Sequence, residues 1–263
     1  VKAESARAIG RFTAVASPCG KKKRPGSKRR ENWTMFQVAA DWNPKQGRLK
    51  EIIQKADHFE EMISLLSDMH SMLHSSCVYD LQTKTYMDEI CMGLGPNTFS
   101  TMPTGKDVTV AWNLWHITRI EDLTANLLVA KSNQVLNEDW LKRLNTGVKD
   151  TANAMSDEEI IRFSEEISMS GLVNYRNAVG KRTKEIIQSL KPEDMKRRVE
   201  KEQLAQILDE GGIIQHKESI WLLDFWGRKT VAGIFLMPIT RHQVGHLNDC
   251  SKLKEKCRKL FSK

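Results

Sequence analysis

The sequence lacks the features that mark membrane, secreted and nucleotide-binding proteins. Its longest apolar runs fall far short of the roughly 20 residues that a membrane-spanning helix needs. Its five cysteines are scattered and form no CxxC pair, which argues against a disulfide framework and a cysteine zinc site. There is no P-loop, no GxGxxG after a strand and no internal repeat. We therefore expect a protein of the reducing cytoplasm with no membrane partner.

Positive charge is not spread over the chain but concentrated at its start. Residues 1–34 contain ten Lys/Arg and two Asp/Glu, whereas the remainder has 31 of each sign. A polyanion-binding surface should be a basic stripe on a folded element, so a nucleic-acid partner is not expected, although association through this tail stays an alternative. Because residues 1–34 also lack hydrophobic periodicity, we expect a disordered tail there and one domain over residues 35–263.

Apolar residues recur at helical spacing along most of the remaining chain. The pattern predicts helices over residues 49–78, 108–130, 156–190, 192–209 and 230–260. Ser156 followed by Glu159 is a capping-box signature, and Pro238 predicts an irregularity within the last helix. No alternating strand pattern competes with these helices. We expect an all-α protein, a four-helix bundle with extra short helices in its long middle connection.

Three histidines stand out, two on the last predicted helix and one on the 108–130 helix, which is apolar almost all round. His242 and His246 are four residues apart in TRHQVGHLND, which places both imidazoles on one helix face at a spacing that can share a metal ion. His116 lies on the buried stripe of the 108–130 helix, where an unpartnered imidazole costs free energy through desolvation. Three neutral imidazoles from two helices form an open divalent-metal site. Two satisfied histidines at a helix seam are the simpler alternative for the HxxxH pair.

At these residues the sequence resembles the DinB-like family, which includes thiol S-transferases and mycothiol-dependent isomerases. The resemblance rests on STMPTGKDVTVAWNLWH, on WHITRIED and on LMPITRHQVGHLND, and it covers roughly residues 35–260. It implies a four-helix bundle, often homodimeric, with a three-histidine metal site formed by His116, His242 and His246. This chain departs from a minimal member by its greater length, mostly between residues 130 and 212.

The implied function is that of a divalent-metal-dependent enzyme, a hydrolase or a thiol-dependent S-transferase. The ion would be zinc or nickel in the first place, and iron or manganese in the second. The partners would be a small-molecule substrate, such as a low-molecular-weight thiol, and a second copy of the chain. A non-catalytic metal-binding bundle is the alternative, with the three histidines only holding two helices together.

Several polar neighbours have two interpretations each. Asn113, Arg119 and Asp249 lie about one turn from the candidate ligands, where they could orient an imidazole or a substrate, but ordinary hydrogen bonding between helices explains them equally well. A competing set on the first helix, made of His70, His74 and Cys77, also has ligand-like spacing. We expect Glu121 and Asp122, by contrast, to pair with surface Lys or Arg.

Overall fold

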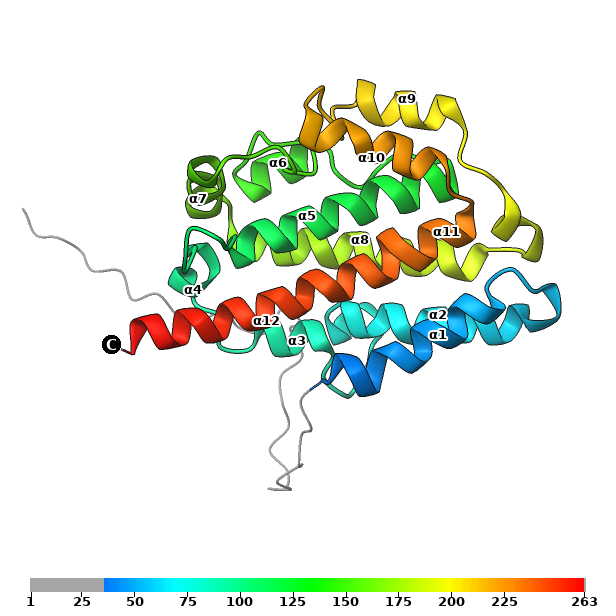
Figure 1. Ribbon diagram of the computed structural model, residues 1–263, viewed down its shortest axis with the longest axis horizontal. Helices are drawn as coiled ribbons and strands as arrows, with labels where there is room; N and C mark the ends of the chain where they lie inside the picture. The colour runs from blue at the N-terminus through cyan, green and yellow to red at the C-terminus, as the bar shows by residue number, and fades with distance from the viewer. Residues whose placement is uncertain (1–35, 263) are drawn as a thin grey trace, which may run out of the picture.

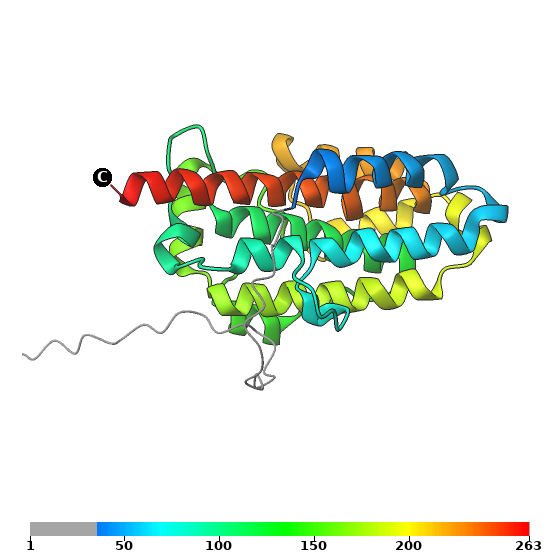
Figure 2. The ribbon, with the colours of Figure 1, turned by 90° about the horizontal axis from the view of Figure 1, so that it is seen from below.

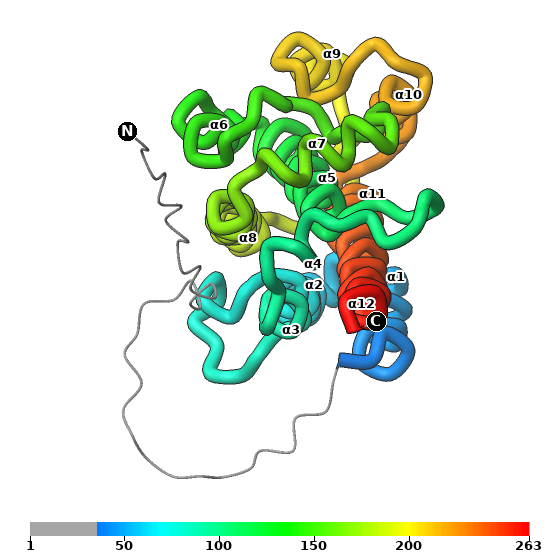
Figure 3. Tube along the Cα trace, turned by 90° about the vertical axis from the view of Figure 1, so that its left-hand side faces the viewer, coloured from blue at the N-terminus to red at the C-terminus, as the bar shows by residue number. Residues whose placement is uncertain are grey.

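The computed structural model describes residues 36–262, and four long helices form its centre. They are α2 (Phe59–Leu73), α5 (Val110–Asp122), α8 (Met169–Ser189) and α12 (His242–Phe261). Each packs against two of the others in the cyclic order α2, α12, α5, α8, and Figure 3 shows them end-on around a shared core. The predicted all-α bundle is confirmed. Within residues 36–262 there is no β-strand, only an isolated bridge between Arg198 and Thr230.

Helix α5 is the central element, as its nearly continuous apolar sequence predicts. All of its residues except Trp112 are buried, because α8 and α12 cover one side while α6 (Glu138–Leu144), α7 (Asp157–Glu166), α9 (Lys201–Asp209) and α10 (Lys217–Gly227) lie along the other (Figure 1). The helix continues as a π-helical segment, η4 (Leu123–Ala130). Polar side chains on α5 must therefore find partners inside the protein.

The single helix predicted over residues 49–78 is wrong. Helix α1 (Asn43–Ile52), which follows the π-helical turn η1 (Val38–Trp42), ends at Ile52; the short η2 (Ala56–His58) then leads into α2, and η3 (Ser76–Val78) follows it. Helices α1 and α2 pack side by side (Figure 2). Apolar periodicity indicates which face of a helix is buried but not where the chain reverses. The pattern therefore predicted one helix where α1 and α2 pack against the same core.

The regions predicted as helices over residues 156–190 and 192–209 are each divided. The capping box of Ser156 and Glu159 is present and opens α7, but a second cap at Ser168 starts α8 separately. Pro192 opens only the short η5 (Pro192–Lys196), and α9 begins at Lys201. The glycine-rich loop after α2 contains two further short helices, α3 (Tyr86–Cys91) and α4 (Pro96–Ser100).

The last helical region contains the irregularity that Pro238 predicts. Helix α11 (Val231–Leu236) passes into a π-helical turn, η6 (Met237–Arg241), which leads directly into α12. Such turns interrupt α-helices mostly where one extra residue is accommodated, often at functional sites. Here the turn ends immediately before His242.

Within the described residues, no helix is both long and apolar enough to cross a lipid bilayer. The predicted basic tail, residues 1–34, lies outside the described part of the chain.

Candidate metal centre

The two histidines of α12 lie one turn apart on the face that contacts α5. The ring centroids of His242 and His246 are 4.5 Å apart. Both side chains are partly exposed, while their neighbours Gln243, Val244 and Leu247 are buried in the bundle. The pair thus lies at the border between the core and the surface.

His116 of α5 meets this pair from the opposite side. Its ring centroid is 5.0 Å from that of His242 and 4.9 Å from that of His246. The Nε2 atoms of His116 and His242 are 3.2 Å apart. One ring nitrogen from each of the three side chains lies within 4.8 Å of those of the other two. The structure therefore brings together the three histidines singled out in the sequence, and we call them the three-histidine cluster.

The second ring nitrogen of His116 identifies its tautomer. His116 Nδ1 lies 2.8 Å from the backbone carbonyl oxygen of Thr151. A carbonyl only accepts hydrogen bonds, so Nδ1 carries the proton and donates it. The Nε2 lone pair is then left for the centre of the cluster. The indole of Trp112 stacks on the imidazole at 4.7 Å, with an angle of 7° between the rings, which further fixes the ring plane.

This contact is part of a larger attachment between α5 and residues 149–152. Four side chains at positions i, i+3, i+4 and i+7 of α5 donate hydrogen bonds to four consecutive backbone carbonyls. The pairs are Trp112 with Ala152, Trp115 with Asp150, His116 with Thr151 and Arg119 with Lys149. Because α5 is buried, its four side-chain donors need such acceptors.

Thr151 is the functional neighbour that sequence reasoning missed. The spacing of polar donors on a buried helix face indicates that some acceptor must lie opposite, but it does not say which segment supplies it. Ala152 adopts a left-handed backbone with φ 59°, which is uncommon for a residue other than glycine. Local strain of this kind persists only where surrounding contacts hold the chain, as the α5 donors do here.

Asn113 orients His246 in the same way. Its amide nitrogen donates to the Thr109 carbonyl at 3.1 Å, so its Oδ1 atom faces the imidazole and accepts from His246 Nδ1 at 2.6 Å. The Nε2 lone pair of His246 is thereby left for the cluster. His242 Nδ1 is buried with no hydrogen-bond partner among the described residues.

Burial keeps all three imidazoles neutral. Desolvation lowers the pKa of His116 to about 3, with a further decrease from His246 nearby. It also lowers the pKa of His242 well below its usual value and that of His246 to a lesser extent. Neutral imidazole is the form that binds metals. The cluster contains no carboxylate; among the described residues, the contact made by its inward-facing ring nitrogens is the one between Nε2 of His116 and Nε2 of His242.

The other two candidate neighbours lie elsewhere. The guanidinium of Arg119 is buried and pairs with Asp122 at 2.9 Å and with the Tyr175 hydroxyl at 2.8 Å. The same side chain donates to the Lys149 carbonyl and so supports the 149–152 segment. Because these contacts occupy the guanidinium, it is not available to a substrate carboxylate. Asp249 pairs with Lys252 at 3.0 Å on the half-exposed side of α12. Its charge raises the pKa of His246 slightly against the effect of burial, without a hydrogen bond to the ring.

The expectation that Glu121 and Asp122 pair with surface Lys or Arg is wrong, because both are fully buried. Asp122 accepts from Arg119 and from Tyr175, the latter at 2.6 Å. Glu121 accepts from His70 at 2.9 Å and from His74 at 3.1 Å. A helix that is covered on every side has no surface on which to place these charges.

His70, His74 and Glu121 thus form a second histidine cluster, which we call the His–Glu–His cluster. A carboxylate of α5 takes the place that the sequence alternative gave to Cys77. The hydroxyl of Tyr79 donates to His70 Nδ1 at 2.8 Å, since burial raises the pKa of this tyrosine and keeps it protonated. His70 Nε2 therefore carries a proton and donates it to Glu121.

His74 is held in the same tautomer by packing. Its Nδ1 has no hydrogen-bond partner in the described part of the chain and lies against Gly180, where it would clash with an added Cβ. Only Nε2 can donate to the carboxylate. Burial lowers the pKa of His74 to about 3, and its two histidine partners hold the pKa of Glu121 well below its usual value against the effect of burial. The His–Glu–His cluster is a complete hydrogen-bonded unit as it stands.

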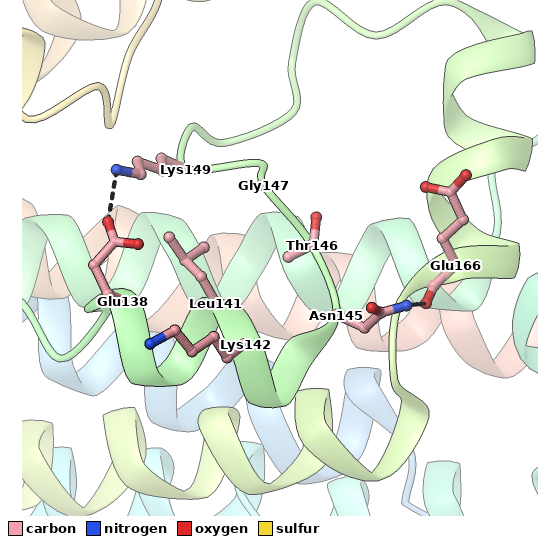
Figure 4. Close-up of a pocket in the computed structure, with 8 residues that line it drawn as sticks. All are labelled: Glu138, Leu141, Lys142, Asn145, Thr146, Gly147, Lys149 and Glu166. Atoms are coloured by element: carbon pink, nitrogen blue, oxygen red, sulfur yellow. Dashed lines mark hydrogen bonds and ion pairs between the residues drawn. The ribbon is translucent and has the colours of Figure 1, made fainter.

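A surface pocket of about 630 Å³, away from both clusters, lies between α6, the loop after it and the end of α7 (Figure 4). Two of its four charged side chains pair with each other, Glu138 with Lys149 at 3.0 Å. Asn145 donates to the backbone carbonyl of Glu166 at 2.9 Å. Among the described residues, no histidine or cysteine lines it, so it offers no imidazole or thiol ligand.

Fold and site together define a helical-bundle protein with a partly buried, carboxylate-free histidine cluster of a kind that suits a divalent metal ion. The family model of the DinB superfamily matches residues 81–249, more than half of the chain and all three histidines of the cluster. The chain therefore belongs to the DinB superfamily. A comparison with curated proteins gives no match.

Proposed function

We propose that this protein is a divalent-metal-dependent enzyme whose metal ligands are His116, His242 and His246. The observation that carries the proposal is the direction of the imidazole lone pairs. The Thr151 carbonyl and the Asn113 amide oxygen fix the proton on Nδ1 of His116 and His246, so their Nε2 atoms are acceptors only. Nε2 of His116 and His242 lie 3.2 Å apart, and a cation between them satisfies both.

A divalent ion in such a site lowers the pKa of a water or thiol ligand towards neutrality. The chain's own residues contribute orientation and exclusion of solvent. Thr151 and Asn113 hold two imidazole rings, and hydrogen bonds of this type strengthen a histidine ligand. Trp112 covers one face of His116. Cys250 is not needed as a nucleophile, because burial raises its pKa and keeps it a thiol.

The reaction class we propose is hydrolysis or thiol-dependent S-transfer on a small molecule. The DinB superfamily membership and the open three-ligand set support both. Purified protein would be assayed with small thiols and electrophilic acceptors, and in parallel with ester and amide substrates. Thiol-dependent turnover identifies a transferase, and turnover without thiol identifies a hydrolase. No turnover in either assay by protein that contains metal supports the non-catalytic alternative.

The ligand set favours zinc or nickel over iron or manganese. Imidazole suits zinc, nickel and iron, but a given site generally binds divalent nickel and zinc more tightly than divalent iron, and manganese prefers carboxylate ligands, which this cluster lacks. Elemental analysis of protein purified without a histidine tag tests the identity directly. We expect one equivalent of metal per chain.

The family resemblance also leads us to propose that the protein acts as a homodimer. Light scattering during size-exclusion chromatography, with and without added metal, measures its mass in solution. A nucleic-acid role through residues 1–34 would instead appear as salt-dependent DNA binding that is lost on their removal.

A further inference from the structure

The three-histidine cluster opens into a small pocket that α10 covers. His116 and His242 form part of the wall of this pocket, which has a volume of about 160 Å³. Its other walls come from the end of α5, from α10 and from the start of the π-helical turn η6. A molecule in this pocket lies directly beside the two imidazoles.

The wall away from the histidines is apolar. It is formed by two aliphatic residues of α5 and α10 and by three aromatic residues of α10. These residues are Ile120, Leu222, Trp221, Phe225 and Trp226, and Met237 and Pro238 complete the wall. Within residues 36–262, no Lys, Arg, Asp or Glu lines the pocket. A charged group placed here would lose its hydration without gaining a partner.

Trp221 indicates that the pocket is open to a ligand and not merely a packing defect. It is 49% exposed, yet its indole nitrogen donates to the Glu218 carbonyl of its own helix at 3.0 Å. The polar edge of the ring is therefore occupied, and the ring packs edge-on against Phe225 at 6.0 Å. An aromatic side chain held in this way offers its apolar surface at the mouth of the pocket.

Three polar residues line the pocket, and two of them, His116 and His242, belong to the cluster. Asn153 is the other polar residue of the wall besides the two histidines. Its Oδ1 accepts from the Thr151 hydroxyl at 2.8 Å, which leaves its amide nitrogen as a donor for a ligand. The pocket is thus polar where the reaction would occur and apolar elsewhere.

We propose that this pocket selects substrates that carry a small uncharged apolar group, aromatic or branched aliphatic, next to the reacting atom. The volume is close to that of an engineered protein cavity of about 150 Å³ that binds benzene, so one six-membered ring fills it. The inference rests on the proposed function for the role of the cluster. The charged parts of a larger substrate or thiol would have to remain outside the pocket, beyond Trp221.

Binding of three probes of similar shape tests the proposal without any turnover. Benzyl alcohol, benzylammonium and benzoate would be titrated into metal-free protein at neutral pH, with detection by saturation-transfer NMR. We expect benzyl alcohol to bind with a Kd on the order of 1 mM, as ligand-efficiency limits allow for so few atoms. We expect the two ions to bind at least about tenfold more weakly, because the pocket desolvates them.

Two variants of one residue and a matched control locate the binding. Trp221→Ala removes the exposed ring and is expected to weaken benzyl alcohol binding about tenfold, while Trp221→Phe retains most of it. Phe261 is equally exposed, at 52%, but lies outside this pocket, so Phe261→Ala is expected to leave binding unchanged. Both positions are at the surface, and thermal melts verify the folding of all three variants.

The outcomes separate this inference from the proposed function. If benzoate or benzylammonium binds as tightly as benzyl alcohol, or if Trp221→Ala binds normally, the pocket proposal is overturned even when the protein contains metal. If benzyl alcohol binds as expected but no metal is taken up, the pocket stands and the metal-dependent function fails.

Discussion

The two histidine clusters, one fully buried and one at the border of the core, use similar side chains in opposite ways. In the His–Glu–His cluster, a carboxylate lies between two imidazoles that both donate to it, and every group is sealed from solvent. In the three-histidine cluster, the protons point outwards to Thr151 and Asn113, and the lone pairs converge. The first arrangement uses its carboxylate as the acceptor for both rings, whereas the second leaves the Nε2 lone pairs of His116 and His246 for a ligand. Proximity of histidines alone therefore does not distinguish a metal site from a structural one.

Charge strengthens this contrast. Glu121 also interacts with the buried guanidinium of Arg176, which binds the Leu73 carbonyl and Gln243 at 2.8 and 3.0 Å. A dication added to the His–Glu–His cluster would leave excess positive charge in a region without solvent, which is costly. His70 and His74 also lie outside the part of the chain that matches the DinB family model. We therefore expect a single metal ion per chain.

The largest expected effect is on metal binding. His242→Ala removes one of three ligands and should weaken zinc binding by more than about 100-fold, since changes to residues that only orient a ligand already cost about 10- to 100-fold. His70→Gln, which retains a donor for Glu121, should keep full stoichiometry. Elemental analysis after dialysis against a weak chelator measures both. Two ions in the wild type, with one lost in His70→Gln, would make both clusters metal sites.

The next effect is on the stability of the fold and concerns the His–Glu–His cluster. Glu121→Ala leaves two buried imidazole donors without their acceptor and the buried guanidinium of Arg176 without a nearby negative charge, and should lower the free energy of unfolding by about 3–5 kcal/mol. Glu121→Gln retains an acceptor and should cost less, about 1–3 kcal/mol. Urea unfolding of metal-free protein gives these values. A Glu121→Ala protein as stable as the wild type would show that the hydrogen bonds to His70 and His74 contribute nothing.

An intermediate effect on metal affinity is expected from substitution of Asn113. Asn113→Ala removes the acceptor that orients His246 and should weaken metal binding about 10- to 100-fold. The matched control is Asp249→Asn, three residues after His246, where a half-exposed carboxylate pairs with Lys252. It should change affinity by less than about threefold, as exposed substitutions usually do. Competition with a chromogenic chelator measures the two affinities. Equal losses in both variants would mean that charge near α12, and not ring orientation, sets the affinity.

The smallest expected effect is the change in the free energy of unfolding for each unit by which the pH falls. Because burial lowers the pKa of His74 to about 3, unfolding of metal-free protein takes up a proton at this residue between about pH 6.5 and 3. Stability should fall as the pH falls through this range, by up to about 1.4 kcal/mol per pH unit for one histidine. In His74→Gln the fall should be shallower. Urea unfolding at pH 7.5, 6 and 5 measures the slope, and identical slopes would show that His74 is not neutral in the fold.

The sequence was sufficient to predict the bundle and the three clustered histidines, but not their surroundings. Helical spacing at His242 and His246, and burial around His116, follow from local pattern. The role of Thr151 does not, because a backbone carbonyl has no sequence signature and it meets His116 only through the folding of a connection 35 residues away. Glu121 was misplaced for the same reason: nothing local shows that α5 is covered on every side.

The π-helical turn at Met237–Arg241 also sets the register of the site. Each residue of an α-helix rotates the direction of the next side chain by about 100°. Removing one residue from this turn, and so restoring a regular helix, would rotate His242 and His246 together around α12 relative to α11. The two histidines would keep their spacing in the sequence, but their side chains would no longer both point towards His116. In sequence alignments of relatives, the length of this short segment is therefore as informative about a conserved centre as the histidines themselves.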